Sequence, residues 1–316
     1  MKIGSWPFFS SGGKANAAIG LELRPEGISA ASVSANGKNS QFRFKLDWCE
    51  YSEETDFTNQ VQLFRAWLSK YGVKKAKLNL VLNRNDFELL MVEPPEVPPE
   101  EFKEAIRWRV KELISFPLEE AVIDAFILPE DAFRGRMKMA YVTVARLEKI
   151  RELVTAFNRK DIELCHIDIP EMTSRNVTAL FENPDIGVAV LRFDEDAGVI
   201  HIAQNKNIYL SRALSIRIEQ IVKFDQEQME FLQLEIQRSL DYYESQLGKG
   251  IVSKVFFAPN TRNLAEATAV LDASLGTEVK LLDIRQLMEV DQKIKNKSLG
   301  GAFSAIGAAL RDGVAV

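Results

Sequence analysis

The sequence contains few of the residues that build disulfide frameworks and metal sites. Its 316 residues include only two cysteines and two histidines. Cys49 and Cys165 lie far apart and form no CxxC spacing, so the sequence favours neither a disulfide framework nor a zinc site, and a reducing compartment fits. Two histidines are also too few for a multi-histidine metal centre. We therefore expect no structural or catalytic metal.

Long runs of one residue class are missing as well. The net charge is -5 and no Lys/Arg-rich stripe occurs, which argues against a nucleic-acid partner. No run of about 18 apolar residues could span a membrane, and residues 1–18 lack the apolar core of a signal peptide. These absences predict a cytoplasmic protein. Residues 1–16 are predicted to be a flexible tail, although Trp6, Phe8 and Phe9 leave open a contact with a membrane surface or a partner.

The common catalytic motifs are absent too. There is no G-x-S-x-G, Walker A or G-x-G-x-x-G pattern, and the fragment Gly12-Gly13-Lys14 lies in the tail without a preceding strand. Cys165 and His166 are neighbours, but adjacent residues of a strand point to opposite faces, so they do not form a nucleophile and its base. His201 lies in the middle of a strand without ligand-type neighbours, which favours a structural role.

The residues that are present predict a globular protein with a repeated architecture. Hydrophobic residues make up 46% of the chain, enough for a sizeable core. Each half is predicted to begin with three antiparallel strands, at 17–23, 28–34 and 41–48 in the first half and at 187–193, 198–204 and 208–214 in the second. In each half, helices then alternate with strands: 61–71, 77–82 and 88–92, and later 226–247, 251–258, 263–275 and 279–282. This pattern is typical of the duplicated ribonuclease-H-like folds of actin, Hsp70 and the sugar kinases.

A further unit lies between the two halves, after the proline-rich connector 93–99. An amphipathic helix over 100–113 is expected to bury one face, and Pro117 to prevent its continuation. That face is made of Phe102, Ala105, Ile106, Val110 and Leu113. Strands are predicted at 121–128, 138–145 and 163–169, and helices at 147–157, 170–180 and 301–310. Arg107, Trp108 and Arg109 lie near the outer face of the first helix, as a solvated flank or a partner surface.

Four short stretches carry a resemblance to a known family. They are Ile19-Gly20-Leu21-Glu22, the run Glu104–Trp108 leading into Ser115–Glu120, His166-Ile167-Asp168, and Ala305–Arg311. With them, nearly the whole chain resembles the PilM-type actin-like proteins of type IV pilus assembly. The resemblance is greatest to the MshI branch, which belongs to mannose-sensitive haemagglutinin (MSHA) pilus systems.

The resemblance implies a domain organisation and a partner. Residues 17–95 and 166–183 would form subdomain 1A, 96–165 an inserted subdomain 1C, 184–300 the second half (2A/2B), and 301–316 a C-terminal helix returning to 1A. In the family, the groove between 1A and 1C takes the cytoplasmic N-terminal tail of PilN, a bitopic inner-membrane protein. The corresponding partner in an MSHA system would be MshJ, which would hold this protein at the inner membrane. The assembly ATPase is a further candidate partner.

The three loops that bind nucleotide in actin-like proteins are altered here. Phosphate binding needs glycines for close backbone approach, together with hydroxyl and amide donors. In the first loop the glycine is replaced by Arg24 and the hydroxyl residue by Pro25, which has no amide donor, and Glu22 and Glu26 flank the site. In the second loop Arg192 precedes the acidic turn 194–196, and no glycine occurs before Gly198. The adenosine loop has Ala258-Pro259-Asn260 in place of a Gly-Gly pair.

These departures predict a pseudo-ATPase scaffold that binds no cofactor, and no ATP or magnesium. Asp194 and Asp196 are then a solvated acidic turn and not a magnesium site. Two alternatives remain open. In the first, Gly27 or Gly198 still contributes to a phosphate-binding loop, and the nucleotide state of the protein controls binding of its partner. In the second, the chain is an adaptor like the type II secretion protein GspL, which docks the secretion ATPase.

Overall fold

The computed structural model describes residues 18–37, 40–181 and 185–314. The predicted tail 1–16, with Trp6, Phe8 and Phe9, lies outside these residues. So does the Asn183-Pro184 break between the two halves.

Two large sheets with the same strand order form the framework of the molecule. The first, in the order β14-β3-β2-β1-β4-β8, contains β1 (Ala18–Arg24), β2 (Gly27–Ala35), β3 (Phe44–Ser52), β4 (Ala76–Val81), β8 (Ile162–Asp168) and β14 (Glu289–Val290). The second, in the order β11-β10-β9-β12-β13, contains β9 (Gly187–Phe193), β10 (Gly198–Gln204), β11 (Asn207–Leu214), β12 (Val252–Phe257) and β13 (Glu278–Leu281). In each sheet three antiparallel strands are followed by two parallel ones. This is the duplicated actin-like fold, so the predicted fold class is confirmed.

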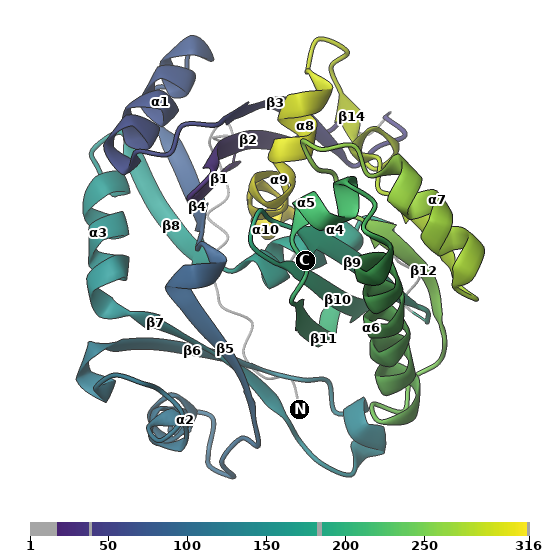
Figure 1. The fold of residues 1–316 in the computed structure, drawn as a ribbon. Helices are drawn as coiled ribbons and strands as arrows, with labels where there is room; N and C mark the ends of the chain where they lie inside the picture. The colour runs from purple at the N-terminus through teal and green to yellow at the C-terminus, as the bar shows by residue number, and fades with distance from the viewer. Residues whose placement is uncertain (1–17, 38–39, 182–184, 315–316) are drawn as a thin grey trace.

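A smaller third sheet forms the inserted unit. Its order is β5-β7-β6, with β5 (Phe87–Val92), β6 (Ala121–Ile127) and β7 (Ala140–Arg146), and α2 (Phe102–Val110) lies beside it at the lower left of Figure 1. Because β5 pairs with β7, the inserted sheet already begins at Phe87, before the predicted boundary at residue 96. At the other end, β8 pairs with β4 of the first sheet from Ile162 onward. The division into subdomains beyond these pairings stays a prediction.

The amphipathic helix of the insert is shorter than predicted. Ile106 and Val110 are buried against the small sheet, as expected from their spacing. The predicted extension to Leu113 is wrong, because α2 ends at Val110 and the chain tightens, with the Leu113 amide donating to the Val110 carbonyl. This turn moves Leu113 off the apolar face and leaves it 54% exposed. Ile114 and Phe116 pack on the cluster in its place.

Helices cover the two large sheets on both faces (Figure 1). On the outer face of the first sheet lie α1 (Phe57–Lys70) and α3 (Leu147–Phe157), and the second sheet is covered by α5 (Ile218–Val222), α6 (Gln226–Ser245) and α7 (Ala265–Ser274). Between the sheets lie α4 (Pro170–Thr178) and α9 (Phe303–Ala309), with α8 (Asn296–Gly301) and α10 (Arg311–Val314) before and after α9. We call the part around the first sheet the first lobe and the part around the second sheet the second lobe.

The central helix α9 packs on its neighbours at backbone distance. A Cβ atom added at Gly20 of β1 would lie 1.8 Å from the Ala305 carbonyl oxygen. One added at Gly307 would lie 2.2 Å from the Thr173 carbonyl oxygen of α4. Only glycine fits at such approaches. This contact gives a physical reason for two of the family-like stretches, since one supplies Gly20 and the other supplies the small residues of α9.

Polar side chains complete this contact between the lobes. Asn79 Nδ2 donates to the Ala308 carbonyl and Asn176 Nδ2 to the Gly307 carbonyl, each at 2.9 Å. Both side chains are buried, so each bond satisfies groups that water cannot reach.

Other element boundaries differ modestly from those predicted. The third strand, predicted at 41–48, is β3 at Phe44–Ser52, and the helix predicted over 301–310 is α9 at Phe303–Ala309, with Gly301 as the last residue of α8. The short elements α5, β14 and the 3-10 turns η1 (Arg84–Asp86), η2 (Leu118–Glu120), η3 (Ala132–Gly135) and η4 (Ile284–Gln286) had no clear sequence signal.

Candidate functional site: the cleft between the lobes

Two tight turns face each other across the cleft where actin-like proteins would place phosphate. In the first lobe, Arg24 pairs with Gly27 and the turn consists of Pro25 and Glu26. In the second lobe, Phe193 pairs with Gly198, and the turn between them is closed by a bond of 2.9 Å from the Asp194 amide to the Ala197 carbonyl. The fold therefore brings the two altered loops together.

The two glycines of these turns have packing partners within their own lobes. A Cβ atom at Gly27 would lie 2.3 Å from the Ser52 carbonyl oxygen of β3. One at Gly198 would lie 2.5 Å from the Phe193 ring. Close packing thus accounts for both residues without a bound phosphate.

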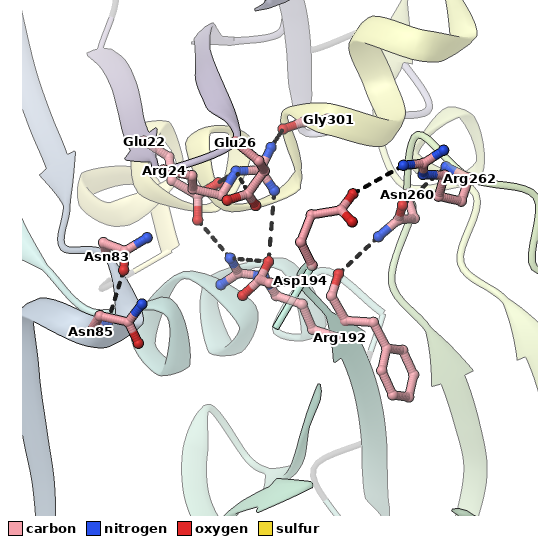
Figure 2. A network of polar contacts seen from close by, with 12 residues as sticks. Glu22, Arg24, Glu26, Asn83, Asn85, Arg192, Asp194, Asn260, Arg262 and Gly301 are labelled. Carbon is pink, nitrogen blue, oxygen red and sulfur yellow. Dashed lines mark hydrogen bonds and ion pairs between the residues drawn. The ribbon is translucent and has the colours of Figure 1, made fainter. Parts of the chain in front are cut away.

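Charged side chains from both lobes fill the space between the turns (Figure 2). Arg192 of β9 donates through one Nη2 atom to Glu22 Oε1 at 2.7 Å and to Asp194 Oδ1 at 2.9 Å. Arg24 lies 3.7 Å from both Glu22 and Asp194, and 3.5 Å from Glu26. We call these five residues the ion-pair cluster. It links β1 to β9 and so joins the lobes.

The ion-pair cluster is largely buried, and burial disfavours the charged form of an ionisable group. Glu22 and Arg192 are 2% and 7% exposed. Burial works against the charges of both arginines, but the neighbouring carboxylates outweigh it and hold the pKa of Arg24 and the pKa of Arg192 above the ordinary value. Burial raises the pKa of Glu26, although Arg24 opposes the shift. Each arginine thus stays charged because carboxylates of the cluster surround it.

Little room remains on the α8 side of the ion-pair cluster. The cavity there has a volume of about 20 Å³, room for about one water molecule. One wall is α8, since Arg24 Nη2 donates to the Gly301 carbonyl at 3.1 Å. The cluster carries three carboxylates against two arginines, so a polyphosphate would meet a net negative charge.

The altered adenosine loop is also occupied by protein contacts. Asn260 Nδ2 donates to the Phe193 carbonyl at 2.8 Å, and a Cβ atom at Gly300 would lie 2.2 Å from the Asn260 carbonyl oxygen. Ala258 is buried, and Pro259 lines the small cavity. The loop Ala258-Pro259-Asn260 therefore packs directly on α8 and on the second phosphate turn.

The acidic turn does not converge on a metal position. Asp194 faces the two arginines of the cluster, and Asp196 is exposed. Within the ranges that the structure describes, no group of three or more His, Cys, Asp or Glu side chains could hold a metal ion.

The contacts and burial of Cys165, His166 and His201 indicate structural roles for these side chains. His166 Nδ1 lies 2.9 Å from Asn79 Oδ1, and the Cys165 thiol donates to the Glu163 carbonyl, so the two neighbours do not form a nucleophile–base pair. His201 is 2% exposed, and burial lowers its pKa to about 3. At neutral pH His201 is therefore an uncharged residue of the second lobe.

Two of the family-like stretches meet at the end of the first sheet. Arg311, which follows α9, donates through Nη1 to Asp168 Oδ2 at 2.5 Å, and Asp168 is 4% exposed. The bond ties α10 to the last residue of β8. Both residues lie in family-like stretches, but no signal in the sequence indicated that they pair.

Comparisons with known proteins agree with the fold. No family model and no curated protein matches the sequence. Among solved structures, the chain is similar to one in the "PilM-PilN type IV pilus biogenesis complex", with a TM-score of 0.75 and 18% identity over 93% of this chain and 98% of that one. It is also similar to the cytoplasmic domain of EpsL, an inner membrane component of the type II secretion system of Vibrio cholerae, with a TM-score of 0.50 and 10% identity over 95% and 96% of the two chains. At these identities the likeness shows a shared fold.

Proposed function

We propose that this protein is a non-enzymatic, actin-like scaffold of a type IV pilus inner-membrane platform. In this proposal it binds the cytoplasmic tail of a PilN-like bitopic membrane protein and works without a nucleotide. The MshI-like stretches make an MSHA system, with an MshJ-like partner, the preferred setting.

The ion-pair cluster carries the proposal that nucleotide is absent. Its arginines occupy the position where phosphate loops would donate to an anion, and Glu22, Glu26 and Asp194 already neutralise them. A nucleotide would have to break buried ion pairs between the lobes, and breaking such a pair by removing one partner costs about 3–5 kcal/mol. On the α8 side of the cluster it would also have to enlarge a cavity of about 20 Å³.

The proposed partner has separate support. The likeness to the chain in the PilM-PilN complex extends over 93% of this chain and 98% of that one. Within the described part of the chain, no helix has the length and apolar character to cross a bilayer. A bound tail would then bring the protein to the cytoplasmic face of the inner membrane.

Calorimetric titration with ATP and magnesium tests the pseudo-ATPase proposal. We expect no binding heat from this protein, with an ATP-binding actin-like protein as the positive control in the same buffer. Magnesium-dependent binding at tens of micromolar, equivalent to about 6 kcal/mol, would favour the alternative in which nucleotide gates the partner.

A peptide titration tests the scaffold proposal. The probe is a fluorescent synthetic peptide with the sequence of the cytoplasmic tail of the PilN-like protein from the same pilus system. We expect saturable binding, and none by a scrambled peptide of equal composition. Equal binding of both peptides, or of neither, would contradict the proposed partner.

The likeness to the EpsL domain favours a second candidate, an adaptor that docks a secretion ATPase. Co-purification of this protein with the assembly ATPase, in the absence of the PilN-like protein, would support that role. Loss of the ATPase from the complex when the PilN-like protein is omitted would favour the scaffold.

A further inference from the structure

A second and larger cavity lies beside the ion-pair cluster. It has a volume of about 490 Å³ and is open to solvent. The first lobe contributes the turn Pro25-Glu26 and η1, and the insert contributes β5. The second lobe contributes the turn 194–197 and the start of β10, and α4 begins at the cavity wall. Figure 2 shows Asn83 and Asn85, which line this cavity, on the first-lobe side of the cluster. Since β5 is the first strand of the insert, the cavity lies where the first lobe, the insert and the second lobe meet.

The charges that line this cavity are mostly negative. Six carboxylates and two arginines contribute to the wall: Glu26, Glu88, Glu171, Asp194, Glu195 and Asp196, against Arg84 and Arg192. Arg192 already forms ion pairs with Glu22 and Asp194. Three of the six carboxylates therefore have arginine partners: Glu26 pairs with Arg24, Asp194 with Arg192, and Glu195 with Arg262.

What remains after this pairing is acidic. Glu88, Glu171 and Asp196 have no ion pair among the described residues, and Arg84 is the remaining cation of the wall, with its guanidinium 4.9 Å from the Phe87 ring centroid. Three carboxylates therefore stand against one arginine. The cavity therefore favours a cation.

Glu171 is the most unusual of these carboxylates. It is the second residue of α4, is 1% exposed and lies in the cavity wall. Ser211 Oγ donates to its Oε1 at 3.3 Å, whereas Oε2 has no hydrogen-bond partner among the described residues. Burial raises its pKa, although Arg84 opposes the shift. A buried carboxylate oxygen without a donor is costly, and a cationic donor from a ligand would remove that cost.

The arrangement suits an organic cation better than a metal ion. The carboxylates line different walls and form no group that could coordinate one ion. A guanidinium spreads its charge over several N–H donors and can reach separated acceptors. Leu89, Leu90 and Val199 also line the cavity and offer apolar contact to an aliphatic stem.

We propose that this cavity receives an arginine or lysine side chain from the tail of the membrane partner. The inference rests on the proposed scaffold function and adds the chemistry of recognition to it. Cytoplasmic segments next to a membrane span carry an excess of lysine and arginine. An acidic cavity between the lobes therefore complements the charge expected of such a tail, and it selects against acidic peptides.

The test measures binding of the tail peptide to full-length variants. Glu171→Gln replaces the buried carboxyl group by a neutral amide of the same shape, and Glu88→Gln does the same at a half-buried position that forms no ion pair among the described residues. Glu227→Gln, an exposed position in the first turn of α6, is the matched control. In parallel, each arginine of the peptide is replaced by citrulline and each lysine by norleucine, one at a time. Melting curves accompany every variant.

We expect Glu171→Gln and Glu88→Gln each to weaken binding, with the larger loss, about 10-fold or more, at Glu171. Glu227→Gln should bind like the unchanged protein. One citrulline or norleucine peptide should show a matching loss that is not increased further by Glu171→Gln.

Binding of the tail with unchanged affinity by both cavity variants would overturn this inference and leave the scaffold function standing. Failure of the unchanged protein to bind the tail at all would overturn both.

Discussion

Removing Arg192 tests whether the ion-pair cluster holds the lobes together. Its guanidinium bonds Glu22 at 2.7 Å and Asp194 at 2.9 Å, and Glu22 is 2% exposed. Arg192→Met keeps much of the side-chain volume but leaves Glu22 with Arg24 at 3.7 Å as its nearest cation. Loss of one partner of a buried pair costs about 3–5 kcal/mol. For a chain of this size we expect the melting temperature to fall by about 5–8 °C.

A second ion pair on the same turn provides the control. Arg262 lies 3.3 Å from Glu195, and the two side chains are 56% and 42% exposed. Exposed pairs contribute about 0–1 kcal/mol, so Arg262→Met should shift the melting temperature little. The double variant Glu22→Gln, Arg192→Met removes the stranded charge and should recover part of the loss. Equal melting temperatures for Arg192→Met and Arg262→Met, measured by calorimetry or circular dichroism, would refute the reasoning.

Three further predictions concern stability. Ile106→Asp places an unpaired charge in the core of the insert and should lower the melting temperature by several degrees. Trp108→Asp, on the same helix at a position 59% exposed, should change the melting temperature little. Similar melting temperatures for the two variants would mean that the apolar face is wrongly placed. Gly20→Val should prevent folding or yield insoluble protein, because its Cβ would collide with the Ala305 carbonyl, and a soluble, native-like variant would contradict this contact. Because burial lowers the pKa of His201 to about 3 from 6.5, unfolding takes up a proton below pH 6.5 and stability falls by up to about 1.4 kcal/mol per pH unit toward pH 4. His201→Leu should flatten this fall in pH-dependent denaturant unfolding, and parallel slopes would show that His201 does not titrate as described.

The sequence predicts the fold well because the fold depends on local periodicity. Three alternating strands at the start of each half, and a glycine-rich apolar segment near the end, are visible without any partner. The positions of the altered loops follow from the same register. By contrast, the end of α2 depends on a turn after Val110 that no local signal marks, and the pairing of β5 with β7 depends on strands distant in the chain.

The ion-pair cluster itself could not be predicted. The sequence places Glu22, Arg24, Arg192 and Asp194 at degenerate positions of the nucleotide cleft. It could not show that Arg192 bonds Glu22 across a sequence separation of 170 residues. Such pairing depends on how the two lobes face each other, which is set by α4 and α9. The cavity around Glu171 was missed for the same reason, because its walls come from six elements and two turns that lie far apart in the chain.

The position of α9 has a consequence for biosynthesis. The core of the second lobe is built mainly from residues 189–279, a nearly continuous stretch of chain. The inner face of the first sheet, however, packs against Phe303, Ala305 and Ile306. During translation, β1 emerges early but lacks its covering helix until almost all of the described chain has left the ribosome. We therefore expect the second lobe to complete its core first, and the inner face of the first sheet to depend on chaperones or on delayed collapse until α9 arrives.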